Sequence, residues 1–314
     1  MSNFVQDIAV KITDNISQVI IGKEELIEKM LVSLFSNGHI LLEDNPGTGK
    51  TTLAKSLAKS MDCAFKRVQF TPDLLPSDIT GINYYNQKLG EFVLKRGSLF
   101  TNLLLADEIN RATPRTQSAL LECMEEHQVT IDGVTYPIEE PFIVIATQNP
   151  IETQGTFPLP EAQLDRFFMK LSMGYPSDKE EIAILNNFIL HNPLSTLENV
   201  VTKQDILTAQ EQVKAITVSD AVKDYIVRIV NATRTHEDIT LGVSPRASLA
   251  LMRASQSLAA INGREFVLPD DVKAICKEVL CHRIIVKNSH LLKQEILAPT
   301  IIQTILDTVE VPII

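Results

Sequence analysis

The sequence lacks an apolar run of about 18 residues, so it predicts no transmembrane helix. Its N-terminus, MSNFVQDIAVKITDN, has no basic start before an apolar stretch and does not resemble a signal peptide. Cysteine is scarce: Cys63, Cys123, Cys276 and Cys281 are scattered and do not have the paired spacing of a zinc site. We therefore expect free thiols in a reducing compartment, and we place the protein in the cytoplasm.

Basic residues are fewer than acidic ones, with 29 Lys and Arg against 39 Asp and Glu and a formal net charge of −10 at pH 7. This balance argues against broad, non-specific binding to nucleic acid or to an anionic membrane. Hydrophobic residues make up 45% of the chain and charged residues 22%, which is usual for a folded globular protein. At 314 residues the chain is long enough for one large and one smaller domain.

The first 175 residues have the pattern of a doubly wound α/β domain, with apolar strands separated by helical stretches. Apolar residues recur at helical spacing over 24–35, and a second helical pattern follows the turn EDNPGTGKT at 43–51. Short apolar runs bounded by polar and turn residues are the predicted strands, and they lie at 39–42, 103–106 and 142–146. We assign residues 1–175 to this core domain.

Two segments predict β-hairpins that interrupt the core. Residues 81–97 have a turn sequence near Lys88 to Gly90, and residues 128–138 contain Asp132-Gly133, a strong signal for a tight hairpin turn. Both hairpins are expected to project from the domain.

After residue 175 the strand patterns stop and helical patterns take over. Ser219 is a plausible helix N-cap, a second helix begins after Pro245, and a third begins near Pro269. We therefore predict a small helical domain, with its connector, over residues 176–314.

The turn at 43–51 has the composition of a phosphate-binding loop. Small residues let backbone N–H groups turn toward phosphates, a lysine meets the β and γ charges, and a hydroxyl binds Mg²⁺. Asp44 stands where the usual pattern begins with glycine, and its carboxylate would either face away from the phosphates or repel them. A glycine-rich turn without a ligand is the alternative. The predicted ATP-binding residues are Pro46, Gly47, Thr48, Gly49, Lys50, Thr51 and Thr52, with Thr51 also at Mg²⁺.

Two acids follow the strand at 103–106, which we expect to lie beside the P-loop strand. Asp107 is predicted to hold the water shell of Mg²⁺, and Glu108 to polarise the attacking water as general base. Without a P-loop upstream, such a pair would indicate only a solvated strand end. The next strand ends in ATQNP, where Asn149 would bond the γ-phosphate or the lytic water, or would simply end the strand in an Asn-Pro turn.

Ordered motifs from about residue 20 to residue 285 make the chain similar to the MoxR family of AAA+ ATPases. They are the P-loop, LLLADEINRA, ATQNP, LPEAQLDRFF at 159–168 and GVSPRAS at 242–248, and QFTPDLLPSDITG at 69–81 resembles a signature of that family. The resemblance implies a P-loop AAA+ core with two inserted β-hairpins that face a central pore, followed by a small all-α lid.

The resemblance also implies roles for individual residues. Asn149 matches the sensor-1 position, Arg166 the arginine finger, and Arg246 the sensor-2 arginine on the lid. Arg111 and Arg115 are expected on the exposed side of the site, where a role at the subunit boundary competes with a solvated helix face. The residues that match the adenine-binding segment are Ile20, Ile21 and Gly22.

The implied function is ATP hydrolysis with Mg²⁺ in a homo-oligomeric ring, by family expectation a hexamer, with the finger supplied by a neighbour. The implied role is a chaperone-like motor that matures or assembles partner complexes, with protein clients that carry a von Willebrand factor A domain. One alternative is a nucleic-acid remodeller or loader, and its only local support is the basic residues Lys88, Lys95 and Arg96 on the first predicted hairpin. Another is a nucleotide-gated scaffold without turnover, which would have no need for all four of Glu108, Asn149, Arg166 and Arg246.

Overall fold

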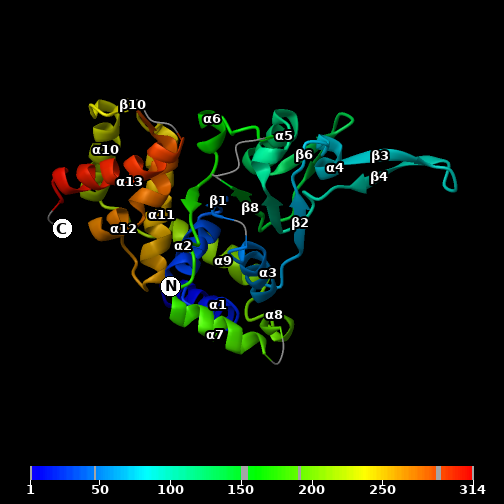
Figure 1. Ribbon diagram of the computed structural model, residues 1–314, viewed down its shortest axis with the longest axis horizontal. Coiled ribbons are helices and arrows are strands. Elements are labelled where there is room, and N and C mark those ends of the chain that lie inside the picture. The colour runs from blue at the N-terminus through cyan, green and yellow to red at the C-terminus, as the bar shows by residue number, and fades with distance from the viewer. Residues whose placement is uncertain (1, 46, 150–154, 190–191, 288–290, 313–314) are drawn as a thin grey trace.

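The computed structural model describes residues 2–45, 47–149, 155–189, 192–287 and 291–312 (Figure 1). Pro46, one of the predicted P-loop residues, lies outside the described residues. The central element is a five-stranded sheet in the order β2-β5-β8-β1-β9, and each neighbouring pair is parallel. Its strands are β1 (Ile40–Glu43), β2 (Phe65–Gln69), β5 (Leu103–Asp107), β8 (Ile143–Gln148) and β9 (Met169–Leu171). The predicted α/β fold class is confirmed.

The strand order corrects one prediction. β5, which ends in Asp107, does not lie beside the P-loop strand β1, because β8 pairs with both and separates them. Chain order does not fix spatial order in such a sheet, since a crossover connection can skip a strand position that a later strand fills. Asp107 is therefore one strand further from the P-loop than the sequence led us to expect.

Alternate residues of the three central strands, β1, β5 and β8, pack into different apolar clusters, as the twofold pleat of a strand requires. On β1, Ile40 and Leu42 contact the cluster that includes α1 (Ser2–Ser17), α2 (Glu24–Phe35) and α3 (Lys50–Ser60). Leu41 joins the other cluster, which includes α5 (Pro114–Glu126). The sheet is thus covered by helices on both faces.

Both predicted hairpins form. Strands β3 (Gly81–Asn86) and β4 (Glu91–Arg96) make a ribbon that extends far from the body (Figure 1). Strands β6 (Gln128–Ile131) and β7 (Val134–Pro137) are joined by Asp132 and Gly133, both at positive φ, which matches the tight hairpin turn that this pair favours. The described part of the core is completed by α4 (Pro76–Thr80), the 3₁₀ turn η1 (Ile109–Arg111) and α6 (Glu161–Leu164).

The rest of the described chain is mainly helical, and the predicted N-cap of α10 is confirmed, since the Ser219 hydroxyl accepts from the Val222 N–H. A short antiparallel pair, Ile239–Leu241 with Ile285–Val286, was not predicted. α1 packs against both α9 (Lys203–Lys214) and α11 (Pro245–Ile261), so the N-terminal helix contacts the second half of the chain. The elements are α7 (Asp178–Phe188), α8 (Pro193–Thr196), α9 (Lys203–Lys214), α10 (Asp220–Thr235), β10 (Ile239–Leu241), α11 (Pro245–Ile261), α12 (Pro269–Leu280), η2 (Cys281–Arg283), β11 (Ile285–Val286) and α13 (Leu291–Thr308).

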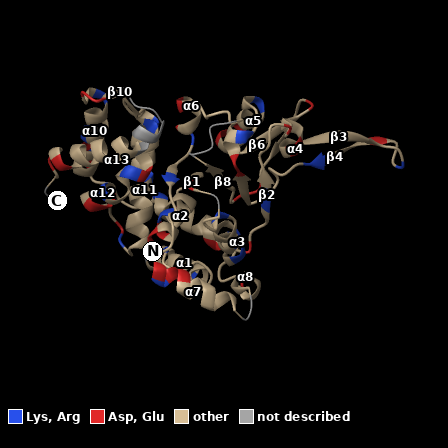
Figure 2. Ribbon diagram, viewed as in Figure 1, with Lys and Arg blue, Asp and Glu red and all other residues tan. Residues whose placement is uncertain are grey.

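Charged residues of both signs are interspersed over the core and the helical half (Figure 2). Among the helices that the structure describes, none is long and apolar enough to cross a membrane. The four cysteines are free thiols, as expected.

Candidate functional site

The P-loop connects β1 to α3 and opens toward solvent. Gly47 and Gly49 have φ values of +86° and +97°, a region that glycine enters without strain, and a methyl group at Gly47 would meet no atom within 4 Å. Lys50 begins α3, so the unpaired N–H groups of that helix end face the cradle. The Lys50 ammonium is bonded only to backbone carbonyls among the described contacts, those of Asp44 at 2.8 Å and Asn45 at 3.1 Å. The loop therefore has room, donors and a cation suited to a bound triphosphate.

The Asp44 side chain faces away from this cradle. Its carboxylate is 6% exposed and accepts hydrogen bonds from the N–H groups of Met173 at 2.7 Å and Gly174 at 3.0 Å, and from the Ser172 hydroxyl at 2.8 Å. These residues directly follow β9. The departure from glycine thus ties the P-loop to the neighbouring strand end and does not line the loop with negative charge.

The predicted acids lie at the carboxyl ends of the strands, on the same sheet edge as the P-loop. Asp107 ends β5 and is 9% exposed. One carboxylate oxygen accepts from the Thr147 hydroxyl at 2.6 Å, and the other accepts from the Arg67 guanidinium at 2.6 Å. Asn149 directly follows β8 and so lies at this edge as well.

Glu108 adopts a left-handed backbone conformation, with φ 55° and ψ 52°. Such a conformation costs free energy in a residue with a β-carbon and is usually retained only where the surroundings impose it. Here the Glu108 N–H donates to the Thr147 hydroxyl at 2.9 Å, and the carboxylate pairs with Arg111 at 3.0 Å. Thr147 thus contacts both acids: it accepts a hydrogen bond from one and donates one to the other. Arg115 is exposed.

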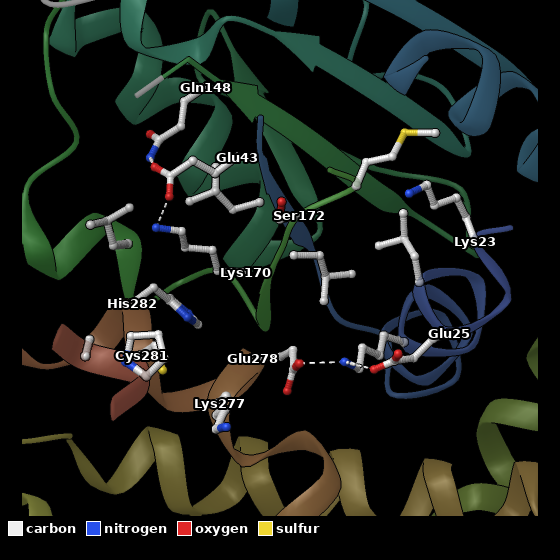
Figure 3. Close-up of a pocket in the computed structure, with 18 of the residues that line it drawn as sticks. Lys23, Glu25, Glu43, Gln148, Lys170, Ser172, Lys277, Glu278, Cys281 and His282 are labelled. Atoms are coloured by element: carbon white, nitrogen blue, oxygen red, sulfur yellow. Dashed lines mark hydrogen bonds and ion pairs between the residues drawn. The ribbon is translucent and has the colours of Figure 1, made fainter. Parts of the chain in front are cut away.

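The predicted adenine segment is partly buried. Ile20 belongs to the apolar core, whereas Gly22 has a φ of +68° and lies against the Glu180 side chain. Gly22 also lines a cavity of about 680 Å³ between the β1–β9 side of the sheet and the helices α12 and α13. In this cavity Lys170 pairs with Glu43, and Lys29 with Glu278 (Figure 3). None of the described P-loop residues from 47 to 52 lines it, so the cavity lies beside the phosphate-binding loop and not within it.

The two predicted arginines lie at the opposite edge of the sheet. Arg166 precedes β9, and Arg246 is in the first turn of α11. Both pair with one carboxylate, that of Glu125 at the end of α5: Arg166 at 3.3 Å on one oxygen, and Arg246 on the other. This carboxylate lies where α5 has returned to the amino ends of the strands, because the carbonyl of the preceding residue, Met124, contacts the His39 ring just before β1.

The length of the strands separates these arginines from the P-loop of the same chain. The central strands β1 and β8 contain 4 and 6 residues. At about 3.3 Å per residue, the two edges are roughly 13–20 Å apart. In this conformation neither arginine can contact a phosphate bound in its own P-loop.

Comparison with known proteins gives the family. Residues 39–169 match the ATPase family associated with various cellular activities (AAA), and residues 231–305 match the AAA lid domain. The chain is 48% identical to the protein YeaC of Bacillus subtilis (strain 168) over 303 residues, which are 96% of this chain and 94% of that protein. It is 43% identical to the chaperone MoxR1 of Mycobacterium tuberculosis (strain ATCC 25618 / H37Rv) over 306 residues, 95% of this chain and 80% of that protein. The chain belongs to the MoxR family of AAA+ ATPases.

A solved structure supports the same fold for this MoxR chain. A protein of Cytophaga hutchinsonii superposes with a TM-score of 0.90 and 39% sequence identity, over 99% of this chain and 97% of that one. This MoxR protein is therefore an ATPase with a parallel sheet of 5 strands and a helical lid.

Sequence reasoning missed three residues that contact the predicted site of this MoxR ATPase. Thr147 bridges the two acids, Arg67 holds Asp107, and Glu125 holds both arginines. A signal was present only for Thr147, which lies two residues before Asn149 and hence on the same side of its strand. Arg67 and Glu125 belong to segments that resemble ordinary charged surface, and only the folded sheet brings them to the site.

Proposed function

We propose that this MoxR ATPase hydrolyses ATP at sites shared by two neighbouring subunits of a ring. The observation that supports the proposal is the division of the predicted residues between two sheet edges. One edge carries the P-loop, Asp107, Glu108 and Asn149, and the other carries Arg166 and Arg246. A subunit that contributes its second edge to the first edge of its neighbour would complete one site and leave its own to be completed by the next subunit.

The first edge would bind ATP and Mg²⁺. The backbone N–H groups of residues 47–52 and the Lys50 ammonium would hold the phosphates, and the Thr51 hydroxyl and the Asp107 carboxylate would hold Mg²⁺. In the described residues no group of three or more His, Cys, Asp or Glu could bind a metal by itself. This fits magnesium, which is usually held by one or two protein groups together with phosphates and water. When bound, the ion neutralises charge on the phosphate oxygens.

Glu108 would act as the general base. Its carboxylate would accept the proton of the attacking water. The left-handed backbone of Glu108 and the hydrogen bond to Thr147 position the backbone from which this side chain extends. The Arg111 guanidinium pairs with one oxygen of this carboxylate at 3.0 Å. Asn149 would orient the water or the γ-phosphate at the same edge.

Arg166 would be the arginine finger, and Arg246 would act beside it. Negative charge grows on the γ-phosphate oxygens during transfer, and a guanidinium placed against them stabilises the transition state more than the ground state. Because both arginines share the Glu125 carboxylate, they would reach a neighbour's phosphate together. The lid would then respond to the neighbour's nucleotide.

The biological role that we propose is chaperone-like maturation or assembly of partner complexes. A relative named chaperone MoxR1 supports the general class. We further propose a hexameric ring in the cytoplasm. Each subunit would have a core of residues 1–175 and a connector with a helical lid over residues 176–314, and its two hairpins would face the pore. The clients would be proteins that carry a von Willebrand factor A domain. The mixed charge distribution in Figure 2 favours protein clients over nucleic acid.

Mixing two inactive proteins tests the shared site. The Glu108→Gln variant lacks the base and keeps the finger, whereas the Arg166→Ala variant lacks the finger and keeps the base. If the finger comes from a neighbour, roughly a quarter of the sites in random equimolar rings are complete, and ATPase activity returns on mixing. Native mass spectrometry must show mixed rings first.

The same mixture can be made with Arg246→Ala in place of Arg166→Ala, and it is expected to regain activity in the same way. A double variant, Glu108→Gln with Arg166→Ala, is the matched control, because it can supply neither part. Mixed rings that stay inactive would contradict the proposal.

A further inference from the structure

Arg283 is a buried cation of the lid that contacts the segment carrying the predicted finger. Its side chain is 2% exposed, and it lies in the turn after α12. The guanidinium donates to the Asp165 carboxylate at 2.8 Å, to the Asp165 carbonyl at 3.3 Å and to the Phe168 carbonyl at 3.2 Å. Further donor bonds reach the carbonyls of Phe167 and Val279. Arg283 of the lid thus donates to backbone carbonyls on both sides of Arg166.

A second lid residue contacts the same carboxylate. The Ser244 hydroxyl donates to the other oxygen of Asp165 at 3.1 Å, and Ser244 lies two residues before Arg246. Both carboxylate oxygens of the residue next to the finger are therefore bonded to the lid. The segment that precedes β9 and the start of α11 are held as one unit, with Arg166 and Arg246 on its surface.

Burial makes this contact set costly to break. A guanidinium that is removed from water must keep its partners, because leaving one donor or the charge unpaired costs several kcal/mol. Burial also lowers the pKa of Arg283 to about 10, while the Asp165 carboxylate acts in the opposite direction. The group stays charged at neutral pH, and the planar fork of arginine suits several carbonyls and a carboxylate at once, which a lysine cannot match.

We propose that Arg283 is a positioning residue, through which the lid of one subunit sets the finger Arg166 that completes the neighbour's site. The inference rests on the shared site proposed above. It places the control of hydrolysis in the lid of the subunit that donates the finger, and not in the lid of the subunit that binds the ATP. A change in lid position in one subunit would then alter the rate of ATP hydrolysis at the site of its neighbour.

The test adds Arg283→Lys to one partner of the mixing experiment at a time. In the Glu108→Gln protein the change affects the donor of the finger, and the restored activity should fall by about tenfold, since small displacements of a catalytic group are costly. In the Arg166→Ala protein the change affects only the acceptor, and the activity should stay within about twofold of the parent mixture, since that subunit's second edge is not used. ATP affinity should be unchanged in both.

Two matched variants keep the test decisive. Ser244→Ala removes one hydrogen bond to Asp165 and should show a smaller loss with the same donor-only pattern, even where Arg283→Lys folds poorly. Arg264→Lys weakens another lid ion pair, to Asp271, that does not contact residues 165–168, and it should lower activity equally little on either side.

Equal losses on the donor and acceptor sides, with an active parent mixture, would overturn the inference and leave the shared site intact. A parent mixture of assembled rings without activity would instead overturn the shared site, and this inference with it.

Discussion

At the scale of single residues, Asp44 shows how a departure from a motif can be resolved only by the fold. The sequence leaves open whether the carboxylate at the start of the P-loop faces away from the phosphates or repels them. The structure directs the carboxylate to two backbone N–H groups and a hydroxyl after β9. A buried carboxylate with three such donors stabilises the ends of two adjacent strands.

We predict that Asp44→Asn destabilises the protein without tightening ATP binding. The amide keeps the shape but not the charge and can accept less from the three donors, so the free energy of unfolding should fall by about 1–3 kcal/mol. Urea denaturation measures this change, and calorimetry measures ATP affinity. A variant that binds ATP several times more tightly would show that the carboxylate does repel the phosphates.

Thr147 is the residue whose hydroxyl connects both acids, and it offers a second prediction. Thr147→Val keeps the shape and loses the hydroxyl, so it frees the Asp107 oxygen and leaves the Glu108 N–H without its acceptor. We expect kcat to fall by about tenfold or more with little change in ATP affinity without Mg²⁺, because the acids lose their placement. Thr147→Ser keeps the hydroxyl and should recover most of kcat. A valine variant with normal kcat would contradict this role.

At the scale of elements, segments with a strong local signal were predicted and segments without one were not. The helix over 24–35, the two hairpins and the cap at Ser219 follow from local patterns that need no partner. The pair β10–β11 has strands of 3 and 2 residues, too short for a twofold pattern to stand out. α13 continues through Pro299, although a proline inside a helical pattern usually ends or kinks the helix.

The positions of the predicted site residues show the same division. The motifs predicted that the P-loop and Glu108 follow strands of one parallel sheet, which the structure shows, but not that β8 lies between β1 and β5, because spatial order depends on crossovers. The Glu125 carboxylate that joins Arg166 and Arg246 also lies far from both in sequence. Contacts of this kind depend on tertiary structure and leave no local pattern.

His39 joins three elements and predicts a pH dependence. Its Nδ1 accepts from the Val144 N–H at 3.0 Å, so the ring is neutral and its Nε2 donates to the Met124 carbonyl at 2.9 Å. Burial lowers the pKa of His39 from 6.5 to about 4, with a smaller contribution from His127. Between pH 6.5 and 4 the His39 ring is therefore protonated in the unfolded chain and neutral in the folded protein.

The stability that neutral His39 provides is thus complete above about pH 6.5 and is lost as the pH falls toward 4, up to about 3 kcal/mol. Burial likewise lowers the pKa of His282. Because both histidines contribute to the pH dependence, the test compares how steeply the free energy of unfolding changes with pH in two proteins. Between pH 6.5 and 4.5 this free energy should fall less steeply in His39→Gln than in the native protein. Parallel curves in denaturant titrations would contradict the assignment.

At the scale of the whole molecule, the sheet is the reason why we propose that two subunits share each ATPase site. Its carboxyl edge carries the groups that would bind and attack ATP, and its amino edge carries the cations that would stabilise the transition state. The described lid holds the second edge through Arg283, Ser244 and the pairing of Arg246 with Glu125. In the proposed ring, assembly and hydrolysis would be coupled by geometry, because the arginines would reach a P-loop only from a neighbouring subunit.

The most direct measurement is a cryo-EM structure of the Glu108→Gln protein with ATP and Mg²⁺, in which slow turnover preserves the γ-phosphate. The shared site predicts that each Arg166 guanidinium lies within hydrogen-bonding distance of the γ-phosphate bound by the neighbouring subunit, while the γ-phosphate of its own subunit stays roughly 13–20 Å away, the length of the strands between the two edges. An Arg166 that contacts the γ-phosphate of its own P-loop would contradict it.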